Sequence, residues 1–152
     1  MKFLNVVDDI IIGNAYASED ELRKMSEAFY EERLTLSVEK AAGITEQEEE
    51  IIEKPTQTYR GDRSEYMIRS SYTRFTYANA SIPKKDVATP IKRGDVLILN
   101  EDYGQYKAEV QLALKDRPQD DRVNVVGHIC PNDMILIDEI NPYSTFKLKF
   151  ID

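Results

Sequence analysis

A stripe of apolar residues with the period of a helix lies close to the N-terminus. It consists of Phe3, Val6, Val7, Ile10 and Ile11. These positions fall at i, i+3, i+4, i+7 and i+8, which places them on one face of a helix. The stripe predicts a helix over residues 2–12. A β-strand is the alternative, because the run Ile10-Ile11-Ile12 is β-branched.

Two capping boxes predict the starts of two further helices. Ser18 and Thr45 are each followed three residues later by a glutamate, so hydroxyl and carboxylate can each accept a hydrogen bond from a backbone amide. We expect helices over residues 19–34 and 46–53. The second should end before Pro55, because helical geometry is disfavoured before a proline. The expected buried side of the first helix carries Leu22, Met25, Phe29 and Leu36.

After Pro55 many segments are β-branched, aromatic or alternately apolar and polar, which is typical of strands. The expected strands comprise residues 66–77, 96–99, 108–114, 123–129, 134–137 and 146–150. Turns separate them, and the second and third strands should form a hairpin. The pattern predicts one α+β domain over residues 1–152. Two or three N-terminal helices (1–55) would pack on an antiparallel β-sheet or small β-barrel of five to six strands (56–152).

Length and cysteine content agree with a single domain in a reducing compartment. The chain has 152 residues, within the range of roughly 100–200 that one domain usually takes. Cys130 is the only cysteine, which excludes an intramolecular disulfide. No apolar run is long enough to span a membrane, and acids interrupt the N-terminal segment too early for a signal peptide. We therefore expect a cytoplasmic protein with no membrane partner.

Charge is distributed unevenly along the chain, whose formal net charge is −8. Residues 1–53 contain 14 acids and 5 bases, residues 54–99 contain 4 and 9, and residues 100–152 contain 10 and 6. Such poles favour contacts between copies of a protein or with a partner of complementary charge. Solvated surface alone is the alternative explanation.

His128 is the only histidine, and Cys130 lies two residues later on the same strand face. A cysteine nucleophile needs a base within hydrogen-bond reach and a third group that orients the base, for which Asp133 is the candidate. The three side chains could instead be metal ligands, but a structural zinc site takes four. We therefore prefer a structural role for these residues and expect no metal site.

Other catalytic patterns are missing from the sequence. Adjacent acids such as Asp120/Asp121 and Asp138/Glu139 point to different sides of a strand or helix, so neither pair forms a catalytic site by itself. The six glycines are spread along the chain, which excludes a glycine-rich phosphate loop in its usual form. We expect a protein that is not an enzyme and that binds no cofactor.

Arginines and aromatic residues alternate over residues 59–77. Both types are enriched at protein interfaces, although they can also bind phosphates and stack on bases. Because the chain is acidic overall, which opposes nucleic acid, a protein interface is the preferred interpretation. A basic loop follows directly. The expected interface comprises Tyr66, Arg69, Tyr72, Arg74, Tyr77, Lys84, Lys85, Lys92 and Arg93.

These features predict a non-catalytic assembly subunit of a larger, viral complex, such as a ring, connector, adaptor or capsid-associated protein. Its partners would be copies of itself or neighbouring subunits. One alternative is a small regulatory or inhibitory protein that mimics DNA through the acidic helix over residues 46–53. A second alternative is an RNA- or nucleotide-binding module, for which the candidate residues are Arg60, Arg63, Tyr66, Arg69, Tyr72 and Arg74.

Overall fold

The computed structural model describes residues 11, 13, 16–30, 33–62, 64–85 and 89–151, and the side chains of residues 27–30 are not included. The elements in chain order are α1 (Glu19–Tyr30), β1 (Leu34–Lys40), α2 (Glu46–Glu53), β2 (Gln57–Thr58), β3 (Met67–Ser70), α3 (Thr73–Thr76), β4 (Asp95–Leu99), the 3₁₀ helix η2 (Glu101–Tyr106), β5 (Val110–Ala113), β6 (Val123–Ile129), the 3₁₀ segment η3 (Pro131–Glu139) and β7 (Thr145–Ile151).

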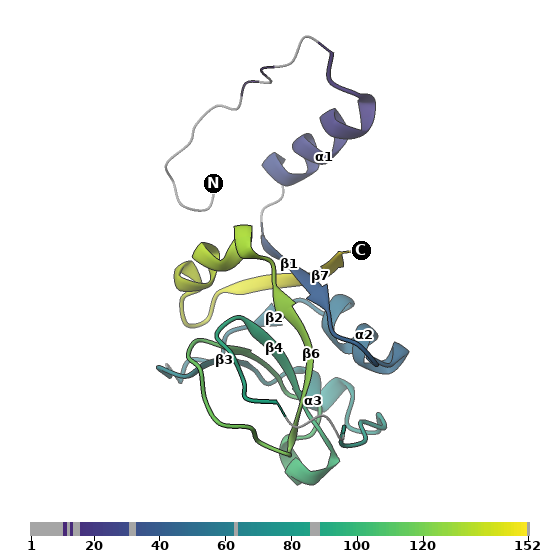
Figure 1. Cartoon of the computed structure of the whole chain (residues 1–152), viewed down its shortest axis with the longest axis vertical. Coiled ribbons are helices and arrows are strands. Elements are labelled where there is room, and N and C mark those ends of the chain that lie inside the picture. The colour runs from purple at the N-terminus through teal and green to yellow at the C-terminus, as the bar shows by residue number, and fades with distance from the viewer. Residues whose placement is uncertain are drawn as a thin grey trace.

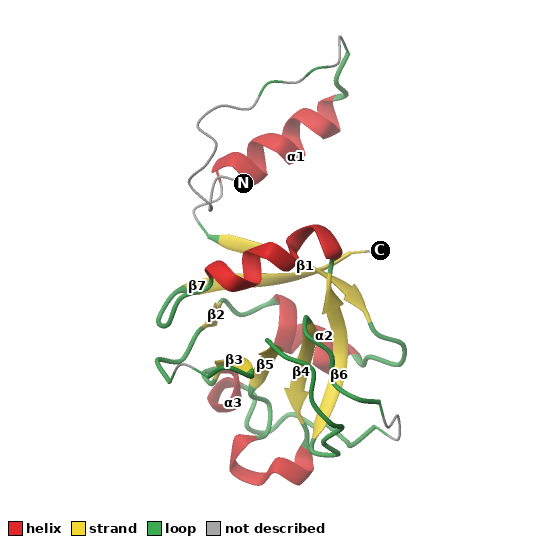
Figure 2. Ribbon diagram, turned by 60° about the vertical axis from the view of Figure 1, so that its left-hand side comes forward, coloured by secondary structure: helices red, strands yellow, loops and turns green. Residues whose placement is uncertain are grey.

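Seven strands form one sheet in the order β2-β7-β1-β6-β4-β5-β3. The pairing of β1 with β7 is parallel, and the other pairings are antiparallel. The two edge strands, β2 and β3, also contact each other. The Arg60 amide, just after β2, donates to the Arg69 carbonyl at 2.8 Å, and the Thr58 amide donates to Ser70 Oγ at 3.1 Å. These contacts nearly close the sheet into a barrel, and its strands curve around one interior (Figures 1 and 2).

Apolar side chains at alternate strand positions fill the barrel. In β5, Val110 and Leu112 belong to the main core, and Gln111 between them lies on the outer face, as the two-residue period of a strand requires. Helix α2 adds Ile51 and Ile52 to the same core. The outer face of β4 and β5 carries a second, smaller cluster, Ile91, Leu97 and Ala113.

The capping box predicted at Thr45 forms, and it is part of a buried polar network. Thr45 Oγ1 accepts from the Glu48 amide at 3.2 Å, and the Glu48 carboxylate accepts from the Thr45 amide at 2.9 Å. Glu48 is buried, receives a hydrogen bond from Asn124 on β6 and pairs with Lys85 at 2.8 Å. Because a buried carboxylate needs such partners, the network ties α2 to β6 and to the loop before β4.

The expected architecture of N-terminal helices packed on a five- to six-stranded antiparallel sheet is wrong. The described chain is mostly a seven-stranded, nearly closed, barrel-like sheet with a few short helices. The capping box at Ser18 starts α1 as predicted, but α1 ends at Tyr30 instead of residue 34. In Figures 1 and 2, α1 stands away from the barrel. The helix predicted over residues 2–12 lies outside the described residues apart from Ile11.

Three expected elements have different structures for identifiable reasons. Leu36 lies in strand β1 and is fully buried in the core, because residues 34–38 alternate apolar and polar with the period of a strand. The single strand expected over residues 66–77 is interrupted where Thr73 Oγ1 donates to the Ser70 carbonyl and α3 begins. The strand expected over residues 134–137 is part of η3, which has Pro131 at its start.

The remaining strands and their hairpin agree with the sequence pattern. β4 and β5 pair antiparallel, with Val96 opposite Leu112, and β6 has the predicted bounds. Among the described residues, no helix is long and apolar enough to cross a membrane.

Candidate functional site

A groove of about 300 Å³ opens where the two edge strands of the barrel approach each other. Three segments form it, namely the end of β2 with the following loop, the segment from β3 into α3, and the turn before β7. Its lining residues are Thr58, Tyr59, Arg60, Gly61, Ser71, Tyr72, Phe75 and Tyr143. We call this feature the aromatic groove.

Three aromatic side chains around this groove are largely exposed to solvent. The exposed fraction is 68% for Tyr72, 67% for Phe75 and 78% for Tyr143. Aromatic rings supply much of the apolar area that folding buries, so several exposed rings beside one hollow indicate a binding surface.

Tyr143 is held in a conformation that residues other than glycine rarely adopt. Its φ is +69°, and the Ser144 amide donates to the Asn141 carbonyl at 3.0 Å, which closes a β-turn with Pro142 and Tyr143 in the centre. Turns of this kind prefer glycine or asparagine at the position with positive φ. A strained non-glycine residue at an exposed position is a reason to suspect a function for its side chain.

Gly61 makes room for the Tyr143 ring. A Cβ atom at position 61 would overlap the atoms of that ring, so only glycine fits beneath it. The Tyr143 amide also donates to the Tyr59 carbonyl at 2.9 Å, which joins the turn to the other wall of the groove. The backbone of the turn is therefore held against the opposite wall, and the Tyr143 ring lies over Gly61 with most of its surface exposed.

A buried ion pair lies beside the groove and positions one of its walls. Glu109 is fully buried, and Arg69 donates to both of its carboxylate oxygens, at 2.7 Å from Nε and 3.1 Å from Nη2. Ser71, a lining residue, donates to the same carboxylate at 2.6 Å. The hydrogen bond to Glu109 raises the pKa of Arg69 above its ordinary value, so Arg69 stays charged.

Two further arginines border the groove. Arg60 lines it, is about half exposed and pairs through Nε with Asp62 at 3.3 Å. Asp62 also accepts from Arg69 at 3.1 Å. Arg74 lies over the rings of Phe75 and Tyr106, 4.6 Å and 5.2 Å from their centroids. This side of the barrel therefore carries three arginines against two acids, Asp62 and Glu109, in a chain of net charge −8.

The structure brings together part of the interface expected from the sequence. Arg69, Tyr72 and Arg74 lie in or beside the groove. Tyr66 lies elsewhere, beneath Lys115. Tyr77 packs against the main core, where burial, followed by the charge of Glu50, raises its pKa.

The expected basic loop is paired within the chain. Ion pairs at 2.7–3.0 Å join Lys84 to Asp121, Lys85 to Glu48, Lys92 to Asp116 and Arg93 to Asp138. Its role in contacts with other molecules, copies of this chain included, stays a prediction. Arg60, Gly61, Phe75 and Tyr143 complete the groove, and the sequence signal for Tyr143 was a bulky residue after Asn141-Pro142, where such a turn favours glycine.

The candidate residues around His128 do not converge. His128 Nδ1 lies 2.8 Å from Asp95 Oδ1, whereas Asp133 accepts from the Ser37 amide at 2.7 Å. Cys130 is buried, and burial, followed by the charges of Glu39 and Asp133, raises the pKa of its thiol. A thiol in such surroundings stays protonated and is a poor nucleophile. No cluster of three metal-ligating side chains occurs in the part of the chain that the structure describes.

Comparison with known protein families shows to which family this chain belongs. A family model described as 6-phospho-N-acetylmuramidase, C-terminal, matches residues 34–149. The chain belongs to this family. The match begins at β1 and ends in β7, so the 6-phospho-N-acetylmuramidase C-terminal family corresponds to the barrel. The sequence matches no curated protein at a significant level.

Two solved structures resemble the chain. An uncharacterized B. cereus protein is 36% identical, with a TM-score of 0.87, over 97% of this chain and 42% of that chain. A conserved protein of unknown function from a locus in Enterococcus faecalis is 26% identical, with a TM-score of 0.68, over 91% of this chain and 36% of that chain. The present chain therefore spans about two fifths of the length of these proteins.

The family membership corrects the function expected from the sequence. A viral assembly subunit is wrong, because the family is named for a sugar-processing enzyme and the similar structures come from bacteria. The alternatives of a DNA mimic and a nucleotide-binding module find no support in this family. The expectation that the protein has no enzymatic role is not supported either, since the family is the C-terminal part of a glycosidase.

Proposed function

We propose that the chain is the carbohydrate-binding part of a glycosidase that acts on a 6-phosphorylated N-acetyl amino sugar, and that the aromatic groove binds this sugar. The observation that supports it most is the group of three exposed rings around one groove, one of them held in a strained turn. The face of a sugar ring presents C–H groups, which pack well on the electron-rich face of an aromatic ring. The family name supplies the substrate class.

The arginines beside the groove suit the phosphate of such a sugar. Arg60 lines the groove, is about half exposed and pairs with Asp62 through Nε. A guanidinium can present two parallel N–H groups to a phosphate, which gives a short and directional contact. Ser71 on the same wall donates its hydroxyl to Glu109, so its oxygen is left to accept a hydrogen bond from a sugar hydroxyl. We assign the phosphate to Arg60 and the sugar ring to Tyr143 and Phe75.

The acids beside the groove favour binding over bond cleavage. Glycoside hydrolysis uses two carboxyl groups on either side of the scissile bond, roughly 5–9.5 Å apart. Here Asp62 and Glu109 are both engaged by Arg69, and Glu109 has no exposed surface. In this proposal the catalytic acids belong to the remainder of the longer proteins, of which this chain spans about two fifths.

Isothermal titration calorimetry with N-acetylmuramic acid 6-phosphate tests the proposal. Removing one stacking ring should weaken binding by about two- to tenfold, because such contacts contribute about 0.5–1.5 kcal/mol. The informative variants are Tyr143→Gly, Phe75→Ala and Arg60→Ala. Tyr66→Ala is the matched control, because Tyr66 is an exposed ring outside the groove.

A titration with unphosphorylated N-acetylmuramic acid tests the phosphate contact separately from the contact with the sugar ring. Wild-type protein should prefer the phosphorylated sugar, and Arg60→Ala should reduce that preference while Phe75→Ala leaves it in place. The absence of binding by the wild-type chain at millimolar sugar would contradict the proposal. Equal losses of sugar affinity in Tyr66→Ala and Tyr143→Gly would contradict the placement of the sugar in the aromatic groove.

A further inference from the structure

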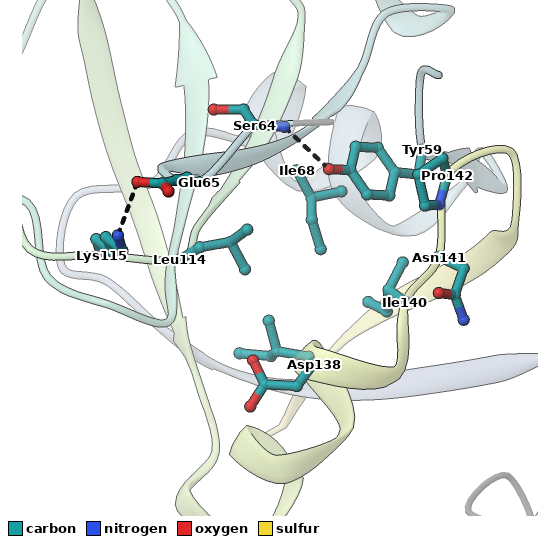
Figure 3. A pocket seen from close by; sticks show the side chains of 11 residues that line it. Tyr59, Ser64, Glu65, Ile68, Leu114, Lys115, Asp138, Ile140, Asn141 and Pro142 are labelled. Atoms are coloured by element: carbon teal, nitrogen blue, oxygen red, sulfur yellow. Dashed lines mark hydrogen bonds and ion pairs between the residues drawn. The ribbon is translucent and has the colours of Figure 1, made fainter. Parts of the chain in front are cut away.

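A second and larger cavity, of about 550 Å³, opens at one mouth of the barrel. Figure 3 shows its side chains around an empty centre. We call it the mouth pocket. The residues that line it are Tyr59, Ser64, Glu65, Ile68, Leu114, Lys115, Ile137, Asp138, Ile140, Asn141 and Pro142. Of these, only Tyr59 also lines the aromatic groove, so the two hollows are separate sites.

The floor of the mouth pocket is aliphatic. Ile68, Ile137 and Ile140 are buried members of the main core, and Leu114 packs against that core. Figure 3 shows Ile68, Leu114 and Ile140 around the opening. Apolar pockets at the mouth of a barrel are common sites for small ligands, which gain free energy by burying aliphatic groups there.

The rim of the pocket carries both signs of charge. Glu65 pairs with Lys115 at 3.0 Å, and Asp138 pairs with Arg93 at 2.9 Å. Glu65, Lys115 and Asp138 are each more than half exposed, and ion pairs so exposed contribute little to stability. A ligand with its own charges can therefore replace the partners of these groups at small cost.

The wall of the pocket does not suit a sugar. Tyr59 is its only aromatic lining residue, and it is buried at 3% exposure, with its hydroxyl accepting a hydrogen bond from the Ser64 amide. The Tyr59 ring is therefore packed in the core and has no exposed face on which a sugar could stack. Aliphatic walls with a cation and two acids at the rim match a different class of ligand.

We propose that the mouth pocket binds a small zwitterionic aliphatic ligand, such as an amino acid or dipeptide with a branched side chain. The aliphatic side chain enters between Ile68, Ile140 and Leu114. The ligand carboxylate binds Lys115, and the ligand ammonium binds Asp138 or Glu65. Charge complementarity of this kind sets which end of the ligand meets which side of the rim.

Calorimetric titration with L-alanyl-L-leucine tests this proposal on the complete chain. Wild-type protein should bind the free dipeptide with a low-millimolar or tighter dissociation constant. N-acetyl-L-alanyl-L-leucine amide, which lacks both charges, should bind several-fold more weakly, because two exposed ion pairs contribute up to about 1 kcal/mol each. Lys115→Met and Asp138→Asn should each remove about half of the difference between the two peptides.

Two controls keep the outcome decisive. Lys54→Met changes an exposed ion pair on α2, neither residue of which lines the pocket, and should leave dipeptide binding unchanged. Phe75→Ala, which alters the aromatic groove and does not touch the lining of the mouth pocket, should also leave it unchanged. Equal affinity for the free and capped peptides, a loss of affinity in Phe75→Ala, or the absence of wild-type binding at ten-millimolar dipeptide would each overturn the proposal. The exposed variants should fold, so lost binding would reflect the site.

Discussion

Replacing Tyr143 by glycine and by alanine should separate the strain of the turn from the contribution of the ring. Both variants remove the ring, and only the backbone preference at φ +69° differs between them. An L-residue in the left-handed region loses about 1–2 kcal/mol relative to its usual conformation. Glycine avoids this loss but gives up roughly 0.5–1 kcal/mol more backbone entropy on folding. Tyr143→Gly should therefore be more stable than Tyr143→Ala by about 1 kcal/mol.

Urea unfolding measures this difference directly. The two variants should share one m value and differ in midpoint, because the folded surfaces are nearly the same. Tyr143→Asn should fall between them, since asparagine tolerates positive φ better than alanine. All three should bind the phosphorylated sugar equally weakly. If alanine proves as stable as glycine at this position, the turn does not hold the strain that we assign to it.

Three further perturbations test the surroundings of the groove and the core. Arg69→Ala should lower the free energy of unfolding by about 3–5 kcal/mol, because it leaves the buried Glu109 without its cation. Lys92→Ala should change it by less than about 1 kcal/mol. Similar losses of stability in the two variants, measured by urea unfolding, would contradict the importance of the buried ion pair. Gly61→Ala should displace the Tyr143 ring and weaken sugar binding by calorimetry; unchanged affinity would show that the ring is not needed. Because the pKa of Cys130 is raised in the folded protein, the thiol of the unfolded chain ionises first as pH rises above about 8.5. The free energy of unfolding should therefore fall with pH in that range, and Cys130→Ala should flatten this dependence. The same pH dependence in wild type and Cys130→Ala would contradict this.

Local sequence signals predicted the elements that depend on nearby residues. The capping boxes at Ser18 and Thr45 form because their partners lie three residues away. The hairpin of β4 and β5 follows from alternation over residues 96–114. These interactions are decided within a few residues, so the sequence reveals them.

Elements decided by distant contacts were harder to predict. Strand β1 was not predicted, and Leu36 was placed on the buried side of the helix expected over residues 19–34 because it continues that helical spacing. The parallel pairing of β1 with β7 joins segments far apart in the chain. The strand expected over residues 66–77 stops at Ser70, where a hydroxyl contact starts α3. Tertiary pairing overrides local preference in the first case, and local hydrogen bonding overrides strand propensity in the second.

The candidate site was only partly visible in the sequence. Arg69, Tyr72 and Arg74 were identified from composition, and they lie in or beside the aromatic groove. Tyr143 is far from them in the chain and reaches the groove because β7 pairs with β2, which in turn closes the barrel against β3. Residues that come together only through such closure cannot be grouped from spacing alone. The cations of the basic loop pair with acids of the same chain that lie far away in the sequence, which spacing alone does not reveal.

Two-dimensional amide spectra of the ¹⁵N-labelled chain, recorded during titration with N-acetylmuramic acid 6-phosphate, test the central claim most directly. The largest shift changes should occur at Gly61, Ser71, Phe75 and Tyr143, and they should saturate together. Amides around the mouth pocket, such as that of Leu114, should change little. The claim would be contradicted by saturable changes centred elsewhere on the barrel, or by unchanged spectra at millimolar sugar.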